Sequence, residues 1–209
     1  MTVVGENVGA GRGGAKQRLP RRRLLLGAPG LLLARHAACS EAQYQLDQRF
    51  SIIQFSVKNL GLFSSQGSFR RFSATLAIDE ARPDRTRIAV NVDANSLDMP
   101  WQEAANMLRS TEFFDVQRYP NVRFTSTSVV AAAPNDYRVS GVLELRGVRQ
   151  PIVLDATLKN RSTDVADFVV KGSLRRSAFG MVAERLFIAD DVNILILARI
   201  RITAASHAG

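Results

Sequence analysis

The sequence predicts an all-β protein whose strands form one antiparallel barrel. The first observation behind this prediction is that apolar and polar residues alternate in about eight runs after residue 44, the period of a strand with one buried face. The second is that turn-forming residues separate these runs, as at Pro134-Asn135-Asp136. The third is that no run is continuously apolar, which favours an antiparallel barrel or sandwich over a parallel sheet.

Each expected strand is defined by its alternating apolar positions. In chain order the runs are Ile53-Phe55-Val57, Ala74-Leu76-Ile78, Ile88-Val90-Val92, Val122-Phe124, Tyr137 to Leu145, Ile152 to Leu158, Phe168 to Leu174, and Val192 to Ile202. Closure into a barrel would remove exposed strand edges. An eight-stranded barrel is either filled by side chains or wide enough for one slender ligand, and periodicity does not decide between these interiors.

One segment, near residues 100–116, has a helical rather than a strand period. Asp98 is expected to cap a helix that begins around Pro100 and continues through Arg109, because apolar residues recur there at helical spacing. A second short turn is expected from Ser110 to Phe114. The fold prediction is therefore an eight-stranded antiparallel barrel with a short helical excursion.

Composition and charge exclude several classes of protein. The chain has 209 residues, of which 46% are hydrophobic and 22% charged, as in a globular domain. The net charge is +9, but residues 1–43 hold seven Lys and Arg residues against two acidic ones, and the remaining charge is spread along the chain. We therefore expect no nucleic-acid partner. No apolar run approaches the roughly 18 residues of a membrane span, so we expect no transmembrane segment.

Catalytic and metal-binding machinery is not visible. The two histidines are His36 and His207, outside the predicted barrel, so the barrel has no histidine base and no zinc site of Cys and His. The single Cys39 permits no disulfide within the chain. Acidic pairs such as Asp79-Glu80 and Asp190-Asp191 are interpreted as turn formers. We expect a binding protein rather than an enzyme, with no cofactor and no metal.

Residues 1–43 are interpreted as a leader outside the fold. Three arginines, Arg21 to Arg23, precede Leu24 to Leu26, and small residues follow, an order that resembles a secretory signal peptide and in particular a twin-arginine signal. The sequence thus predicts export to the periplasm. The alternatives are a disordered basic tail, an organelle presequence, or a lipid anchor at Cys39. Residues 44–204 would form the barrel domain and 205–209 a tail.

Five stretches of the predicted barrel together resemble the YceI-like family. They are Phe55 to Gly61, Gly67 to Phe72, Leu97 to Thr127, Val139 to Val148, and Leu174 to Met181. The resemblance extends in order from Tyr44 to Ile202. It implies a lipocalin-like, elongated barrel, usually periplasmic or secreted, whose tunnel binds a polyisoprenoid, its phosphorylated form or another long-chain lipid. Such barrels often pair, so a homodimer is a further expectation.

This chain departs from the family at one position. Members often carry a histidine where this sequence has Asn59. Asparagine can donate and accept hydrogen bonds, but it cannot become cationic near neutral pH. A head-group contact at this position would therefore be neutral.

Phenylalanine dominates the aromatic residues, with 11 Phe against one Trp and three Tyr, and apolar walls suit a polyprenyl or acyl chain. Arginines that could meet a phosphorylated head group are Arg70, Arg71, Arg109, Arg175 and Arg176. Each of these phenylalanines could instead be an ordinary core residue, and each arginine a solvated surface residue. If side chains fill the barrel, the alternative function is that of a structural or stress-related interaction protein. The candidate ligand-binding residues are Phe55, Val57, Asn59, Phe69, Phe72, Met107, Leu108, Phe113, Phe124, Phe179 and Met181.

Overall fold

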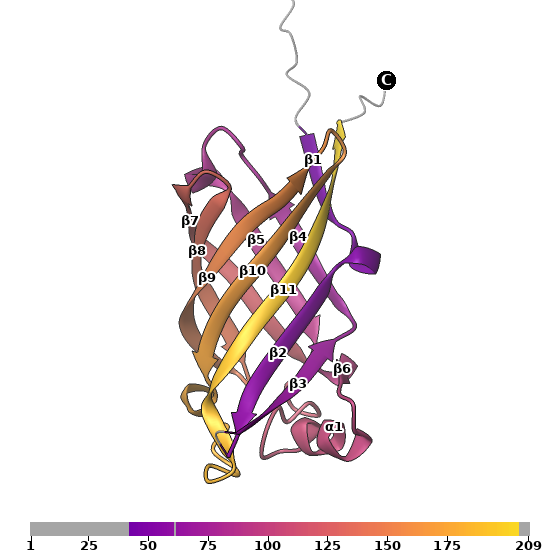
Figure 1. Ribbon diagram of the computed structural model, residues 1–209, viewed down its shortest axis with the longest axis vertical. Coiled ribbons are helices and arrows are strands. Elements are labelled where there is room, and N and C mark those ends of the chain that lie inside the picture. Colours follow the sequence, from indigo (N-terminus) through magenta and orange to yellow (C-terminus); the bar gives the residue numbers. More distant parts are fainter. Residues whose placement is uncertain (1–41, 61, 205–209) are drawn as a thin grey trace, which may run out of the picture. The chain divides into compact units, whose positions relative to one another are not determined.

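The computed structural model describes residues 42–60 and 62–204. Residues 1–41 of the predicted leader, with Cys39, and the predicted tail lie outside the described residues, whereas Ala42 and Gln43, which were assigned to the leader, belong to the first strand. The described part of the chain is mostly strand and curls into one elongated barrel (Figure 1).

Eleven antiparallel strands form a single sheet. Their spatial order is β4-β5-β7-β8-β9-β10-β11-β2-β3-β6, and β1 pairs with β11 off this path. The strands are β1 (Ala42–Leu46), β2 (Ile52–Asn59), β3 (Phe63–Phe69), β4 (Phe72–Ala77), β5 (Arg87–Asp93), β6 (Leu97–Asp98), β7 (Asn121–Ala133), β8 (Asp136–Leu145), β9 (Val148–Arg161), β10 (Val165–Arg175) and β11 (Ile188–Ala204).

The all-β antiparallel prediction is confirmed. The eight runs of alternating residues correspond to β2, β4, β5 and β7 to β11. Three strands were not predicted. Strand β3 escapes notice because its interior is Ser, Gln and Gly, and β6 because it is two residues long. Strand β1 is too short to show an alternating pattern, and it is extended because it pairs with the C-terminal end of β11, where Tyr44 is opposite Ile202.

Strand β11 is the seam of the barrel. It has 17 residues and pairs with β10 along most of one edge. Its other edge is shared, because Ile188 to Leu197 pair with β2 and Ile200 to Ala204 pair with β1. Strand β1 also lies beside β4, which brings the first strand of the sheet order close to the seam.

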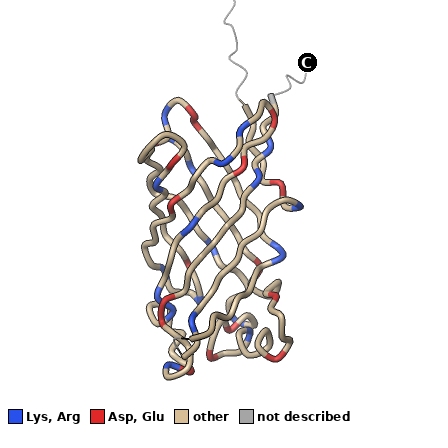
Figure 2. Tube along the Cα trace, in the orientation of Figure 1, with Lys and Arg blue, Asp and Glu red and all other residues tan. Residues whose placement is uncertain are grey.

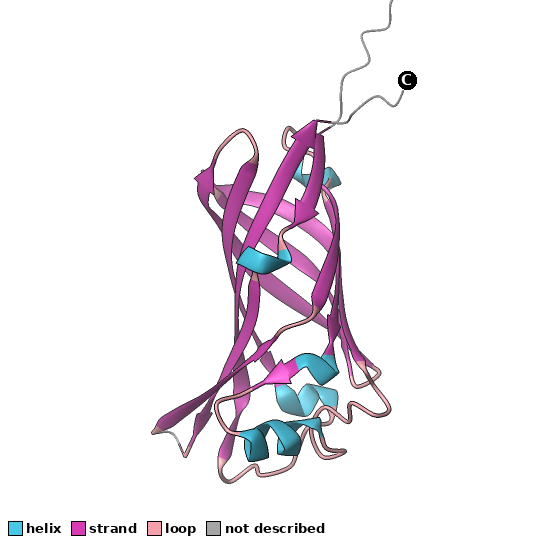
Figure 3. Ribbon diagram, turned by 90° about the vertical axis from the view of Figure 1, so that its right-hand side faces the viewer, coloured by secondary structure: helices cyan, strands magenta, loops and turns pink. Residues whose placement is uncertain are grey.

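One end of the barrel carries the longest helix (Figure 3). This is α1 (Gln102–Arg109), which confirms the helical excursion. The shorter helices are η1 (Gln48–Phe50), η2 (Pro83–Arg85), η3 (Ala94–Ser96) and η4 (Arg176–Phe179). The expected cap by Asp98 is wrong: Asp98 is extended in β6 and its carboxylate accepts a hydrogen bond from Arg70 Nη2 at 2.6 Å. Trp101 occupies the cap position without a side-chain hydrogen bond.

Charges of both signs are interspersed over the barrel wall (Figure 2). Several form pairs between neighbouring strands, such as Arg199 with Asp167 at 2.7 Å and Arg138 with Asp155 at 3.2 Å. Asp190 was interpreted as a turn former but is the third residue of β11, and Asp167 is likewise the third residue of β10. Both use hydrogen bonds to arginine or serine rather than turn geometry to satisfy their carboxylates.

Candidate functional site

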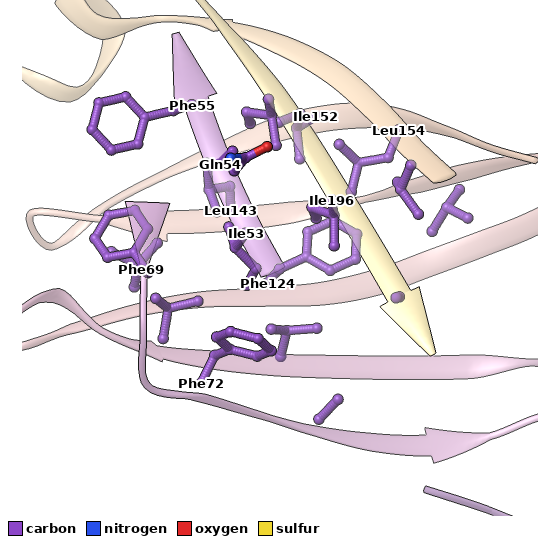
Figure 4. A pocket seen from close by; sticks show the side chains of 18 of the residues that line it. Ile53, Gln54, Phe55, Phe69, Phe72, Phe124, Leu143, Ile152, Leu154 and Ile196 are labelled. Carbon is purple, nitrogen blue, oxygen red and sulfur yellow. The ribbon is translucent and has the colours of Figure 1, made fainter. Parts of the chain in front are cut away.

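A cavity of about 540 Å³ occupies the barrel. It is lined by inward-facing side chains from nearly every strand, because alternate residues of a strand point to the same face. Figure 4 shows Phe55, Phe69, Phe72 and Phe124 around it, and these residues come from β2, β3, β4 and β7. The barrel interior is therefore hollow rather than filled by its side chains.

Aliphatic residues form much of the remaining wall. Ile152 and Leu154 of β9 and Ile194 and Ile196 of β11 all line the cavity. These are the apolar members of the alternating runs, so the same period that predicts the strands also predicts which side chains face inward. Strand β7 departs from strict alternation. A register shift between Ser126 and Ser128 lets both Phe124 and Val129 face the interior, although they are an odd number of positions apart.

Three aromatic rings meet inside the barrel toward the end that carries α1. The ring centroids of Phe55 and Phe69 are 5.7 Å apart, as are those of Phe69 and Phe114, and Phe55 and Phe114 are 6.3 Å apart. Phe114 follows α1, and its backbone N–H donates to the Leu108 carbonyl at 2.9 Å. The tilted and edge-on geometry is favourable for aromatic packing, so this cluster gives the cavity a firm aromatic wall.

Ten of the eleven candidate residues line this cavity, and Phe179 does not. Phe179 is 3% exposed and packs in the core at η4, where the backbone is helical and strand alternation does not aim its side chain inward. The ten are Phe55, Val57, Asn59, Phe69, Phe72, Met107, Leu108, Phe113, Phe124 and Met181.

Asn59 contributes an open hydrogen-bond acceptor to the lining. Its Nδ2 donates to Ser65 Oγ at 2.5 Å. Its Oδ1 is buried and has no hydrogen-bond partner among the described residues. A buried polar atom without a partner costs free energy, so this carbonyl oxygen is suited to accept a hydrogen bond from a bound molecule.

A buried arginine lies close to the same place. Arg176 is 4% exposed and lines the cavity. Its guanidinium donates to four backbone carbonyls, those of Met181, Ala183, Ile188 and Ala189, at 2.7–3.0 Å. Ile188 is also the register partner of Asn59, which puts the cation beside the Asn59 end of the cavity. Burial lowers the pKa of Arg176, and the nearby Asp190 carboxylate opposes that effect.

A second polar group borders the cavity at the opposite end. The Tyr44 hydroxyl donates to Glu80 Oε1 at 2.6 Å, and Arg161 Nη2 donates to both Glu80 oxygens at 2.6 and 2.8 Å. Burial, together with the hydrogen bond to Glu80, raises the pKa of Tyr44 to about 12. Burial raises the pKa of Glu80, but the hydrogen bonds from Tyr44 and Arg161 outweigh it and leave that pKa below its ordinary value.

Most of the arginines considered for head-group binding are engaged elsewhere. Arg70 pairs with Asp98 at 2.6 Å and Arg71 with Asp93 at 2.8 Å. Arg109 donates to the Leu97 carbonyl and to Asn106. Arg175 is exposed, and of these five arginines only Arg176 lines the cavity.

Several lining residues were missed by the sequence analysis. The aliphatic walls were predictable from strand alternation, which already identified these positions as inward-facing. Tyr44, Glu80 and Arg161 carry no common signal, because Tyr44 and Glu80 are 36 positions apart and Glu80 and Arg161 are 81 apart. Only the curling of the sheet brings these three residues together.

Across residues 42–60 and 62–204, no three or more His, Cys, Asp or Glu side chains are grouped so as to hold a metal ion. Among the same residues, no helix is long and apolar enough to cross a membrane.

Comparison with known sequences identifies relatives over most of the chain. The UPF0312 protein ECA1782 of Pectobacterium atrosepticum is 33% identical over 172 residues, which cover 79% of this chain and 89% of the relative. Protein YceI of Salmonella arizonae is 29% identical over 162 residues, covering 74% and 84% of the two chains.

Solved structures share the fold. Burkholderia cenocepacia BcnA superposes with a TM-score of 0.69 at 23% identity, covering 74% of this chain and 98% of that chain. A domain from Saccharophagus degradans, described as polyisoprenoid-binding and implicated in plant cell wall breakdown, gives a TM-score of 0.59 at 18% identity and covers 78% and 100%. The family model for the YceI-like domain matches residues 44–200. By that match and by its relatives, the chain belongs to the YceI-like family.

Proposed function

We propose that this protein is an exported lipid-binding barrel that holds a polyisoprenoid or similar long apolar chain in its lumen and carries out no catalysis. The observation that carries the proposal is the hollow, apolar interior. Its volume of about 540 Å³ lies within the range of small-molecule sites, roughly 300–1,000 Å³. The walls are phenylalanine and branched aliphatic side chains, which suit a chain without polar groups along its length.

The family supports the same assignment. One structural neighbour is described as a polyisoprenoid-binding domain, and this chain has the same fold. Family membership by itself does not identify a ligand, so the cavity is the stronger argument. The alternative, a structural or stress-related interaction protein, expects side chains to meet across the barrel, and a cavity of this size disfavours it.

Retention of the chain would depend mainly on burial. Each methylene removed from water contributes about 0.8 kcal/mol, so affinity should rise with chain length. The polar end of the ligand would contribute orientation, with a hydroxyl or protonated head donating to Asn59 Oδ1 and the unused N–H of Arg176 as a nearby donor.

The direct test is extraction of the purified protein with organic solvent, followed by mass spectrometry and by binding of a series of prenols of increasing length. We expect a long-chain lipid in the extract and affinity that increases with length. An empty barrel that also takes up no prenyl or acyl probe would refute the proposal. Affinity that is flat with length and collapses at high salt would show that charge holds the ligand.

Two variants distinguish the contribution of the apolar cavity wall to prenol affinity from that of the polar group at Asn59. Phe124→Ser should weaken long prenols more than short ones, because only long chains reach that part of the wall. Asn59→Ala should weaken all lengths by a similar factor. Val153→Ser is the matched control, since Val153 is exposed on the outer face of β9 and should leave every affinity unchanged.

The periplasm is the proposed location, and the arginine-leucine order within residues 1–43 is the reason for it. Cell fractionation with mass determination of the mature N-terminus tests this part separately. Full-length, uncleaved protein in the cytoplasm would contradict export.

A further inference from the structure

We infer that the barrel docks on a lipid bilayer through the apolar rim, defined as Leu60, Leu62, Phe63, Trp101, Leu186 and Phe187, at the end that carries α1. Among the described residues, twelve large apolar side chains are exposed, and eight of them lie at this end of the barrel: the rim, Met107 and Val182. Exposed apolar clusters of this kind mark interaction sites.

The rim is built from three chain segments. The turn between β2 and β3 supplies Leu62, which is 81% exposed, and the loop before β11 supplies Leu186, which is 86% exposed. These two segments are joined by a hydrogen bond from the Leu60 N–H to the Phe187 carbonyl at 2.8 Å. Trp101, which is 66% exposed, immediately precedes α1. Helix α1 lies at the same end of the barrel (Figure 1). The apolar groups thus project from turns and loop tips rather than lining a concave protein-binding groove.

The chemistry of the rim favours a bilayer as its partner. Leucine and phenylalanine insert among acyl chains, and tryptophan prefers the boundary between acyl chains and head groups. Two exposed cations, Lys58 and Arg185, lie near the leucines with one exposed acid, Glu184, and this net positive charge suits anionic lipid head groups. The cavity lining reaches the surface at the same end, because Met107 of α1 both lines the cavity and is 39% exposed.

The opposite end of the barrel differs in character. There the cavity is bordered by Tyr44, Glu80 and Arg161, which form a hydrogen-bonded polar group. Among residues 42–60 and 62–204 the two ends are therefore chemically distinct, and the end that carries α1 is the one that exposes leucine and aromatic side chains. Resting on the proposed lipid-binding function, the rim would be the end through which a chain passes between membrane and lumen.

The chain offers its own reporter for this docking. Trp101 is the single tryptophan of the whole sequence, so its fluorescence reports the rim and nothing in residues 1–43. The full chain is titrated with vesicles of three parts phosphatidylcholine to one part phosphatidylglycerol. We expect the emission of Trp101 to shift to the blue and to be quenched by lipids brominated near the glycerol.

The rim variant is Leu62→Ser with Leu186→Ser, and the wall control is Val130→Ser with Val153→Ser, two exposed valines of the barrel wall. The rim variant should lower the vesicle partition coefficient roughly tenfold or more, since two leucine side chains no longer enter the bilayer. The wall control should partition like the unaltered chain.

Three results would overturn the inference. One is co-sedimentation with vesicles without any change in Trp101 emission, and the second is an equal shift in the rim variant. The third is a shift that depends on protein concentration without vesicles, which would show that a second copy covers the rim. Prenol binding in solution is measured in parallel. A protein that docks on vesicles but binds no prenol would refute the proposed function alone. A protein that binds prenols but does not dock on vesicles would refute the docking inference alone.

Discussion

Gly147 is required by the turn that joins β8 to β9. Arg146 and Gly147 form a two-residue connection in which both residues have positive φ, at 53° and 71°, as tight hairpins of right-handed twist require. A Cβ at position 147 would also lie 2.8 Å from Tyr119 Cε1. Gly180 has a similar φ of 76°, but a Cβ there would meet nothing within 4 Å.

Substitutions at Gly180 and Gly147 distinguish the cost of a strained backbone from the cost of a steric clash with Tyr119. Gly180→Ala should lower the free energy of unfolding by about 1 kcal/mol, the cost of a left-handed backbone without glycine. Gly147→Ala should cost more, about 2–3 kcal/mol, because the ring of Tyr119 must also move. Urea denaturation of the two variants measures the difference, and equal losses would contradict a contribution from Tyr119.

Asp190 should make the protein sensitive to acid. The Ser177 hydroxyl and backbone N–H donate to its carboxylate at 2.7 and 2.8 Å and hold the pKa of Asp190 below its ordinary value. A lowered folded-state pKa contributes stability that is present above the unfolded value, near 4, and is lost as the pH falls through the folded value.

The expected result is a free energy of unfolding that declines as the pH falls below about 4, with a shallower decline in Asp190→Asn. Asp191→Asn, at the exposed neighbouring position of β11, is the control and should keep the steeper decline. Denaturant titrations between neutral pH and pH 3 provide the measurement. Identical acid profiles in all three proteins would exclude a role for the Ser177 contacts.

At the scale of elements, strand β1 is attached by a few contacts that can be tested individually. It pairs with β11 over five positions, and the Tyr44 hydroxyl donates to Glu80 after β4, which also accepts from Arg161 at the end of β9. Tyr44→Phe removes the donor to Glu80. We expect faster amide hydrogen exchange in β1, with exchange in β2 unchanged because β2 pairs independently with β3.

Alkaline pH should have a related effect. The pKa of Tyr44 is raised to about 12, so its neutral form contributes stability that is fully present below the ordinary value of 10 and is lost as the pH rises toward 12. Tyr44→Phe cannot ionise and should lack this part of the decline. Exchange in β1 that does not respond to the substitution would show that backbone pairing alone holds the strand.

Alternation in the sequence predicts most strands of the barrel but not all of them. Alternating residues predicted eight strands and the inward-facing side of each, because burial imposes the period directly on the sequence. The polar strand β3 has no such apolar period, because its inward positions before Phe69 are Ser65 and Gly67, and its pairing with β2 is visible only in the folded sheet. Phe179 was placed in the site by its motif, but η4 turns it into the core, and local sequence does not encode that rotation.

At the scale of the whole molecule, the cavity is formed by side chains from strands that are far apart in the sequence. The sequence left open whether the interior is filled, because the volume between strands depends on barrel radius as well as on residue size. Ala198 and Leu197 are neighbours on β11, and only Ala198 lines the cavity, whereas Leu197 is exposed. They offer a direct comparison of inward and outward substitutions.

Ala198→Phe should fill part of the lumen and reduce the length of prenol that the protein retains, without lowering the thermal midpoint much, because the ring occupies existing space. Leu197→Phe adds the same ring to the outer face and should leave the length preference unchanged. Mass spectrometry of the lipids extracted from each variant compares them. Equal length profiles would mean that the bound chain does not pass this part of the wall.

The seam at β11 also sets the order in which the molecule can assemble. Its contacts to β2 and to the preceding Ser51 join distant parts of the chain: the Arg199 N–H donates to Ser51 Oγ across 148 positions. Hairpins such as β7–β8 and β8–β9 need only neighbouring residues, whereas the seam needs nearly the entire domain, and such long loop closures are slow. The edges of β2 and β11 therefore stay unpaired until late in folding. The lumen itself comes into existence only when they meet, so any guest acquired during folding must be captured at that final closing step.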